Sequence, residues 1–239
     1  MTDILKNKNC LITGATGALG SELAKQLYEK GCNLYLTGTN YDKLQKLVLE
    51  LTENNDNRGI FYYKCDFTSL SSVKDLIESI DQFLEPDILI NSAGIFSINE
   101  IDDIKDLDLE RHLNINVKVP YLLCRYFSQG MKKRKWGKII NVGSSSSYTG
   151  FKGGSLYCMT KHAILGMSRA LHEEFKKYNI QVSCVSPSSM KSEMAKISVD
   201  QDFSTFLEPK DVAEQIVNVL CMENNMTCKE LRLDRVIMK

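Results

Sequence analysis

Short apolar runs of strand length alternate with segments of helical period along nearly the whole chain. Most of these runs are apolar without interruption, which is typical of strands that are buried on both faces. Strands of this kind that alternate with helices predict a parallel sheet with helices on both sides. The sequence therefore predicts an α/β fold, a doubly wound parallel sheet of about seven strands flanked by helices.

The expected elements follow one another without a break that would separate domains. We expect strands at residues 9–13, 33–37, 60–64, 87–91, 138–142, 180–185 and 230–234. We expect helices at residues 19–28, 41–51, 69–84, 107–133, 155–178 and 209–221. No internal repeat or linker divides the chain, so residues 1–239 are expected to form one domain.

Two polar stretches rich in glycine and serine interrupt the alternation, at residues 143–154 and 186–205. Each follows an expected strand. In open α/β sheets, ligands bind beyond the carboxyl ends of the strands. We therefore expect the functional site at these two stretches, with residues 188–206 forming a lid over the substrate.

Composition excludes several classes of function. The 30 Lys and Arg residues balance 30 Asp and Glu residues, whereas a nucleic-acid-binding protein needs a clear cationic excess. No apolar stretch reaches the roughly 18 residues that could span a membrane, and the N-terminus has no signal-peptide core. The eight cysteines form no C-x-x-C pair and no cluster with the three histidines. We therefore expect a cytoplasmic protein with no nucleic-acid partner, no membrane partner and no metal site.

The turn between the first strand and the first helix reads TGATGALG, at residues 13–20. Glycine permits a positive φ in a tight turn, and small residues let the backbone approach a pyrophosphate. The helix that follows directs free N–H groups and its positive dipole end at the phosphates. A tight turn without a ligand is the alternative interpretation. The expected cofactor contacts in this turn are Gly14, Thr16, Gly17, Leu19 and Gly20.

Two Tyr-x-x-x-Lys pairs occur in the chain, Tyr148/Lys152 and Tyr157/Lys161. The first lies among glycines and serines, where nothing would hold the two side chains on one face. The second begins a helical segment, in which residues four apart are neighbours. An ammonium beside a phenol lowers the tyrosine pKa from its ordinary value near 10. We therefore expect Tyr157 to transfer protons, with Lys161 lowering its pKa.

Taken together, several motifs resemble the short-chain dehydrogenase/reductase family, in its single-domain branch that includes 3-oxoacyl-carrier-protein reductases. The motifs are the glycine turn, Asp66, the Asn-Ser-Ala-Gly sequence at residues 91–94, Ser144 and Tyr157/Lys161. The resemblance extends from Thr13 to Pro187, with a weaker resemblance in the last helix and strand. It implies a Rossmann-type fold that binds NAD(H) or NADP(H).

The resemblance also assigns roles within a catalytic group of four residues. It implies that Ser144 hydrogen-bonds the substrate carbonyl, and that Asn116 holds a water linking Lys161 to solvent. The neighbouring serines at residues 145–147 are alternatives to Ser144, and Asn114 is the alternative to Asn116. By the same resemblance, the cofactor would contact Tyr157 and Lys161 and, elsewhere, Asp66, Phe67, Asn91, Ala93, Gly94, Pro187, Met190 and Ser192. For Asp66, a helix cap is the alternative interpretation, because residues 66–69 are also typical of the start of a helix.

The end of the second expected strand bears on the choice between NAD(H) and NADP(H). An acidic residue there would bind the ribose 2′-hydroxyl, whereas an arginine would accommodate a 2′-phosphate. The sequence at residues 37–40 is TGTN, with neither. Thr39 and Asn40 can donate hydrogen bonds to a phosphate, and no carboxylate repels it. The sequence therefore favours NADP(H) over NAD(H).

Three positions depart from the family pattern. Ala18 and Ser188 stand where glycine is usual, and Ser92 replaces the second asparagine of the N-N-A-G motif. The glycine spacing that results is commoner in larger nucleotide-sugar enzymes of the family. All three residues are small or polar, so we expect cofactor binding to be retained.

The resemblance implies an oxidoreductase that transfers a hydride between NADP(H) or NAD(H) and a small-molecule carbonyl or alcohol. It also implies a homodimer or homotetramer. Two other classes are alternatives: a dinucleotide-binding regulatory protein without turnover, and a nucleotide-sugar epimerase or dehydratase. The intact Ser144/Tyr157/Lys161 set argues against the first. The short chain after Pro187 argues against the second, because such enzymes carry an additional substrate domain.

Overall fold

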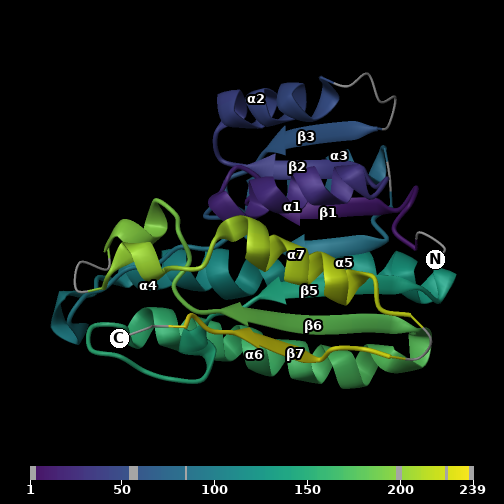
Figure 1. Ribbon diagram of the computed structural model, residues 1–239. Coiled ribbons are helices and arrows are strands. Elements are labelled where there is room, and N and C mark those ends of the chain that lie inside the picture. Colours follow the sequence, from purple (N-terminus) through teal and green to yellow (C-terminus); the bar gives the residue numbers. More distant parts are fainter. Residues whose placement is uncertain (1–3, 54–58, 84, 198–200, 224–225, 237–239) are drawn as a thin grey trace.

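The computed structural model describes residues 4–53, 59–83, 85–197, 201–223 and 226–236. Its seven strands form one parallel sheet in the order β3-β2-β1-β4-β5-β6-β7, with helices on both faces (Figure 1). The chain starts in the middle of the sheet at β1, builds outward to β3, then crosses to β4 and builds outward the other way. The predicted doubly wound, Rossmann-type α/β fold is confirmed.

The strands lie within two residues of their expected positions. Their bounds are β1 Asn9–Thr13, β2 Asn33–Gly38, β3 Ile60–Lys64, β4 Ile88–Asn91, β5 Gly137–Val142, β6 Ile180–Pro187 and β7 Glu230–Leu233. Their agreement with the sequence follows from burial. A central strand in this sheet is covered by helices on both faces, so almost every position must be apolar.

Six helices were expected, and five of them lie close to the predicted positions. The helices are α1 Ala18–Glu29, α2 Tyr41–Thr52, α3 Leu70–Asp81, α4 Asp106–Leu113, α5 Val119–Arg134, α6 Ser155–Phe175 and α7 Pro209–Leu220. Ser69 is the N-cap of α3, where its hydroxyl accepts from the Ser72 N–H, rather than its first helical residue. Residue 84, at the end of this predicted helix, lies outside the described residues.

The long helix expected at residues 107–133 is divided, and this prediction is wrong in its continuity. A π-helical segment, Asn114–Lys118, separates α4 from α5. Pro120 gives the physical reason, because a proline has no N–H to donate to the carbonyl four residues before it. The wider π turn accommodates that missing bond, and such segments are frequent at functional sites.

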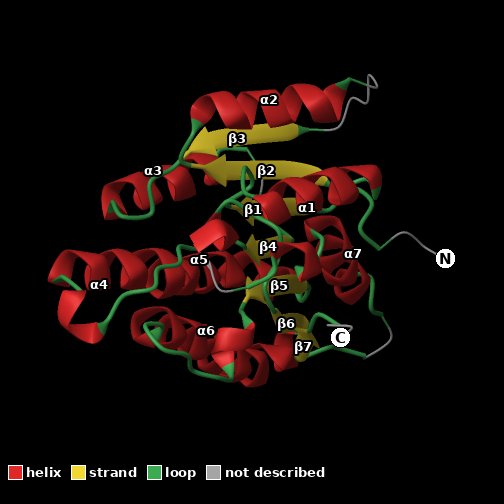
Figure 2. Cartoon of the chain, turned by 60° about the vertical axis from the view of Figure 1, so that its left-hand side comes forward, coloured by secondary structure: helices red, strands yellow, loops and turns green. Residues whose placement is uncertain are grey.

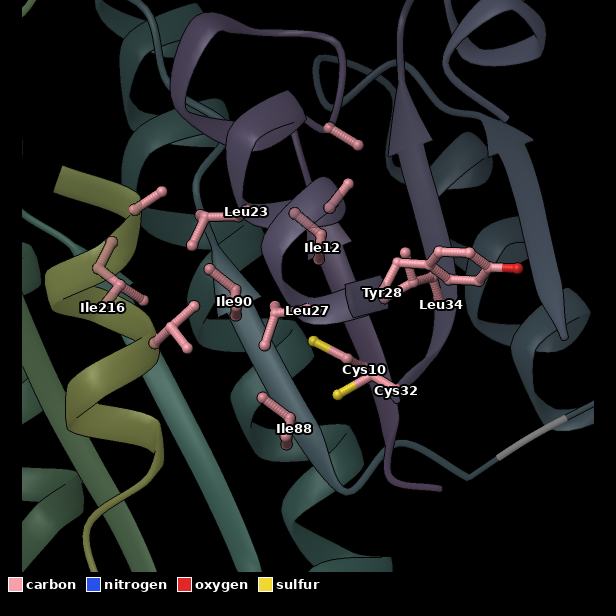
Figure 3. Packing of buried hydrophobic residues seen from close by; sticks show 14 of the residues in the cluster. Cys10, Ile12, Leu23, Leu27, Tyr28, Cys32, Leu34, Ile88, Ile90 and Ile216 are labelled. Atoms are coloured by element: carbon pink, nitrogen blue, oxygen red, sulfur yellow. The ribbon is translucent and has the colours of Figure 1, made fainter. Parts of the chain in front are cut away.

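Two apolar cores hold the layers together, one on each face of the sheet. Figure 2 shows α1 and α7 on one side of the strands and α3, α5 and α6 on the other. In β1, Ile12 faces the first layer and Leu11 the second, because successive side chains of a strand point to opposite faces. Figure 3 shows Leu27 of α1 and Ile216 of α7 packed with Ile90 of β4 in the first core.

The expected lid follows β6. Its described parts contain two short 3-10 turns, Met194–Ile197 and Phe203–Thr205, and a single bridge joins Met190 to Leu207. Residues 198–200 of the lid, and residues 1–3 and 237–239 of the expected domain, lie outside the described residues. Within the described ranges, none of the helices has the length and apolar character needed to cross a bilayer.

Candidate active site

A cleft of about 2120 Å³ opens at the carboxyl ends of the strands. Its volume exceeds the roughly 300–1,000 Å³ of an ordinary small-ligand pocket, so a dinucleotide and a second molecule can share it. Two of the expected site residues, Asn91 and Asn116, are buried behind the cleft. The other expected residues line it: Gly14, Thr16, Gly17, Leu19, Gly20, Thr39, Asp66, Phe67, Ala93, Gly94, Ser144, Tyr157, Lys161, Pro187, Met190 and Ser192.

The glycine turn presents the N-terminus of α1 to the cleft. Gly14 has a φ of +64°, and a Cβ on it would lie 2.8 Å from the Cα of Ala93, so only glycine fits. Gly17 is the N-cap of α1 and offers no side chain to its N–H groups. The first intrahelical bond is that from the Ser21 N–H to the Gly17 carbonyl, 2.9 Å long. The N–H groups that precede it form the expected anion site.

Two lysines that the sequence reasoning missed lie at the end of the cleft beside β2. Lys64 ends β3 and pairs in register with Gly38 of β2, while Lys43 lies in the first turn of α2. Both line the cleft together with Thr39. The N-cap of α2 is Asn40, whose side chain accepts from the Lys43 N–H at 2.9 Å. That cap was a signal in the sequence, because it places Lys43 in the helical turn next to the end of β2.

Asp66 lines the cleft, and it does not cap α3, the alternative that the sequence offered, because Ser69 takes that position. Its Oδ1 accepts from the N–H and the hydroxyl of Thr68, at 2.9 and 2.8 Å, just before the Ser69 cap of α3. These two hydrogen bonds lower the pKa of the Asp66 carboxyl. The group is therefore a carboxylate at neutral pH, able to accept further hydrogen bonds from the cleft side.

Three of the four expected catalytic residues meet at the centre of the cleft. Ser144 follows β5, and Tyr157 and Lys161 lie in the first two turns of α6. The Ser144 side chain lies close enough to Tyr157 to lower the pKa of its phenol. The Lys161 Nζ lies 5.7 Å from the centroid of the Tyr157 ring and donates to the Val142 carbonyl at 2.8 Å. The helix thus brings residues four apart into one site, as expected.

Hydrogen bonds within the run of four serines at residues 144–147 fix the position of Ser144. The Ser144 N–H donates to the Ser147 hydroxyl, and the Ser146 N–H donates to the Ser144 hydroxyl, each at 3.1 Å. Ser146 and Ser147 are buried, and Ser145 and Ser146 line the cleft beside Ser144. Ser144 is the one of the four whose side chain lowers the pKa of Tyr157, and the Ser147 hydroxyl holds its backbone in place.

The electrostatics of the pair differ from the expectation. Burial raises the pKa of Tyr157 to about 12, and the hydrogen bond from Ser144 offsets only part of that rise. Burial also lowers the pKa of Lys161 to about 8. The prediction that Lys161 lowers the Tyr157 pKa is therefore wrong for the chain alone. The physical reason is that burial disfavours both charged forms, and the Lys161 ammonium is directed at a main-chain carbonyl.

Asn116 lies in the π-helical segment and connects two parts of the site. Its Oδ1 accepts from the Ile95 N–H at 2.9 Å, and its Nδ2 donates to the Ile95 carbonyl at 3.0 Å. Its Nδ2 also donates to the Thr160 hydroxyl at 3.1 Å, which donates in turn to the Tyr157 carbonyl at 2.8 Å. In a regular helix, residue 120 would donate to the Asn116 carbonyl, but Pro120 has no N–H to give.

The remaining alternatives have other partners. The hydroxyl of Tyr148 donates to Glu230 at 2.8 Å, while Lys152 lies 3.3 Å from Glu100, so this rival pair does not act as one unit. Asn91, expected at the cofactor, lies behind the cleft lining, where its Nδ2 donates to the Asn141 Oδ1 at 2.8 Å. Its side chain is directed along the sheet, between β4 and β5, because both asparagines occupy paired positions in register.

A profile of the short chain dehydrogenase family matches residues 8–202. The chain belongs to this family. The family resemblance expected from the motifs is therefore confirmed, and the protein is an NAD(P)-dependent oxidoreductase acting on carbonyl and alcohol groups. This assignment favours an oxidoreductase over the two alternatives, a regulatory protein without turnover and a nucleotide-sugar enzyme.

The similarity of this short-chain dehydrogenase to known proteins extends over most of its length. It is 30% identical over 221 residues to the 3-oxoacyl-[acyl-carrier-protein] reductase FabG of Rickettsia felis, covering 89% of this chain and 88% of that one. A metagenomic short-chain oxidoreductase in complex with NADP matches with a TM-score of 0.84 at 21% identity, covering 98% and 99%. A 4-hydroxyisoleucine dehydrogenase complexed with NADH matches with a TM-score of 0.83 at 24% identity, covering 95% and 97%.

The residues of the cleft fit a nicotinamide dinucleotide. The glycine turn is packed too tightly against Ala93 to admit a side chain at residue 14, which leaves bare backbone at the N-terminus of α1. Gly94 leaves a second bare surface, where a Cβ would lie 3.4 Å from the Asn116 Oδ1 and 3.8 Å from the Lys161 Nζ. A dinucleotide would thus be held at one end by helix N–H groups and at the other beside Lys161.

Proposed function

We propose that this short-chain dehydrogenase reduces a carbonyl compound, or oxidises the corresponding alcohol, with NADP(H) preferred over NAD(H). The observation that carries the reaction is that Ser144, Tyr157 and Lys161 line one cleft together, with the Lys161 Nζ 5.7 Å from the centroid of the Tyr157 ring. When bound, the nicotinamide supplies or accepts the hydride. The protein's own contribution is to hold the substrate oxygen and to move one proton.

Ser144 and Tyr157 are the two groups that would hold the substrate oxygen. A carbonyl oxygen between their hydroxyls accepts a hydrogen bond from each, which withdraws electrons from the carbonyl carbon. Because burial keeps the Tyr157 pKa near 12, its hydroxyl carries its proton at neutral pH and can donate it. An alkoxide is a stronger base than a phenolate, so the proton passes to the substrate oxygen during reduction.

Lys161 and Asn116 would restore the proton that Tyr157 gives up. Lys161 has a pKa of about 8, so its ammonium can exchange a proton near neutral pH. The Asn116 carbonyl receives no N–H from residue 120, because that residue is proline, and a water bound to this carbonyl would be the next member of the path. Lys161, such a water and solvent would form the proton path.

The preference for NADP(H) is supported by Lys43 and Lys64 beside Thr39. A 2′-phosphate on the ribose would meet two ammonium groups and no carboxylate at the end of β2. The fold alone does not decide the cofactor, since one structural neighbour carries NADP and another NADH. Replacing both lysines with alanine should raise the Kd for NADPH at least about tenfold and change that for NADH less than threefold. Equal losses for both cofactors would contradict the assignment.

The direct test of the mechanism is the substitution Tyr157→Phe. It removes one hydroxyl and leaves the ring, so turnover of a suitable ketone should fall by about 10²–10⁴ with the Kd for NADPH unchanged. Tyr148→Phe is the matched control, because Tyr148 donates to Glu230 instead. Turnover by the Tyr157 variant equal to that of the Tyr148 variant would exclude the proposed role.

Three further expectations are part of the proposal. Residues 188–206 would form the substrate lid, because much of their described part lines the cleft. A homo-oligomer is supported by exposed apolar side chains on α4 and α5, namely Leu109, Leu113, Tyr121 and Tyr126. A reducing, cytoplasmic setting is supported by the eight cysteines, six of which are buried, since the described residues show no disulfide between them.

A further inference from the structure

Three aromatic side chains form a wall that begins at the catalytic tyrosine. The ring of Phe96 meets that of Tyr157 edge-on with centroids 4.8 Å apart, and lies 6.2 Å from the ring of Phe151. Phe96 follows β4 and Phe151 lies in the loop after β5. A hydrogen bond of 2.9 Å from the Asn99 N–H to the Gly153 carbonyl ties these two loops together. The aromatic wall therefore adjoins the hydroxyl that would transfer the proton.

Two glycines fix the position of Phe151 in this wall. Gly153 has a φ of +72°, which closes the turn after Phe151. A Cβ on Gly154 would overlap the far end of the Phe151 ring, so the ring lies directly against the backbone there. Gly154 is also the N-cap of α6, the helix that carries Tyr157. The wall is thus built on the same turn as the catalytic group.

Large apolar side chains gather at this end of the cleft while staying exposed. Ile98 and Phe151 are 39% and 41% exposed, and Met194, Ile197 and Phe203 of the lid are 40%, 47% and 38% exposed. All five line the same cleft although they come from three separate loops. A group of exposed large apolar side chains on a soluble domain marks a binding surface. A ligand with a large apolar surface would cover these side chains.

The charges at this end of the cleft balance one another among the described residues. Each lining lysine of these loops pairs with a glutamate: Lys152 with Glu100, Lys191 with Glu208, and Lys196 with Glu193. An anionic substrate would have to compete with these carboxylates for its cation. A neutral substrate would leave all three pairs in place.

We propose that the substrate is a neutral carbonyl compound, or its alcohol, with an aromatic ring or another bulky apolar group next to the reacting carbon. This proposal rests on the oxidoreductase function proposed above. The carbonyl oxygen lies between Ser144 and Tyr157, and the apolar group lies against Phe96 and Phe151. The lid side chains, among them Ile197, cover its other side. The reaction is the one already described: a hydride and a proton add across the carbonyl, or leave the alcohol.

The test compares kcat/KM for four carbonyl compounds with NADPH. Acetophenone has the apolar ring, 2-butanone lacks it, and 4-acetylbenzoate adds a carboxylate to the same ring. The acetoacetyl thioester of N-acetylcysteamine represents the substrate class in the name of the Rickettsia relative. We expect acetophenone to exceed each of the other three by at least about tenfold, because loss of apolar contact or burial of an unpaired charge costs that much or more.

Substitutions in the aromatic wall and the lid test whether these residues bind the apolar group of the substrate. Phe151→Ser and Ile197→Ser should lower kcat/KM for acetophenone by about tenfold and that for 2-butanone less than threefold. Leu49→Ser is the matched control, because Leu49 is 61% exposed on α2 and lies outside the cleft lining. It should leave both values unchanged. Circular dichroism and the Kd for NADPH check that each variant folds and binds the cofactor.

Each outcome separates the substrate class from the proposed function. If 4-acetylbenzoate or the thioester is the best substrate and its turnover depends on Tyr157, the oxidoreductase function holds and the apolar substrate class is wrong. If the two wall variants affect acetophenone and 2-butanone equally, the apolar wall is not the binding surface. If NADPH binds but acetophenone is not turned over, the apolar substrate class is wrong.

Discussion

Replacing Lys161 with methionine should change how the stability of the protein depends on pH. Lys161 is only 6% exposed, and burial lowers its pKa from 10.5 to about 8. A shift of that size means that the folded state holds the ammonium less favourably than the unfolded chain by about 3 kcal/mol. Methionine has a similar length and no charge, so the variant is free of this penalty at every pH.

The sign of the effect follows from which state binds more protons. Below pH 8 the lysine is charged in both states, and the folded protein carries the full penalty. Between pH 8 and 10.5 the folded state has lost the proton while the unfolded chain keeps it, so stability rises with pH. The free energy of unfolding of the wild type, minus that of Lys161→Met, should therefore rise by about 2.5 kcal/mol between pH 7 and pH 10.

Urea unfolding followed by the fluorescence of Trp136, the single tryptophan, measures this difference at each pH. Lys138→Met is the matched control, since Lys138 is 3% exposed and its pKa is also lowered to about 8 by burial, far from the cleft. It should show the same rise with turnover retained, whereas Lys161→Met should lose turnover. A difference between wild type and Lys161→Met that stays flat or falls between pH 7 and 10 would refute the reasoning.

Three other substitutions test separate parts of the argument. Gly14→Ala should lower the free energy of unfolding by about 1–3 kcal/mol in urea and weaken NADPH binding, because alanine is strained at φ +64° and its Cβ meets Ala93. Thr160→Val removes the hydroxyl between Asn116 and the Tyr157 carbonyl, so kcat should fall about tenfold with KM and the Kd for NADPH nearly unchanged; an equal change in all three would indicate general unfolding. Tyr121→Glu places a charge on a 48% exposed apolar position of α5, and sedimentation should show a smaller assembly than the wild type; an unchanged assembly would place the interface elsewhere.

The strands and the glycine turn could be predicted because their physical causes are local. A run such as residues 9–13 is apolar throughout, since both faces of β1 are covered, and no other element of this length needs that pattern. The positive φ of Gly14 and the close approach of Ala93 explain why the turn needs a glycine there. Both features are marked by residues close together in the sequence, so the sequence predicts them.

The division of the long central helix was hard to predict from the sequence. Residues 107–133 keep a helical period throughout, and a π turn has the same composition as an α turn. Pro120 was the available signal, because a proline inside a helix removes one hydrogen bond and forces an adjustment nearby.

The sign of the Tyr157 pKa shift was missed for a different reason. A sequence shows that a tyrosine and a lysine lie four residues apart, but it does not show how deeply the two side chains are buried.

The contacts that hold the site together escaped prediction because one partner in most of them is a main-chain atom. Lys161 donates to the Val142 carbonyl, and Asn116 bonds both the N–H and the carbonyl of Ile95. Any amino acid at residue 142, and any except proline at residue 95, offers the same atoms, so those positions carry no sequence signature of their role. The carboxyl ends of β4 and β5 thus supply fixed backbone, and the functional side chains of the helices bind to it. In such a site, residues 116 and 161 must keep their side chains. Their partners, residues 95 and 142, need only keep the position of the backbone.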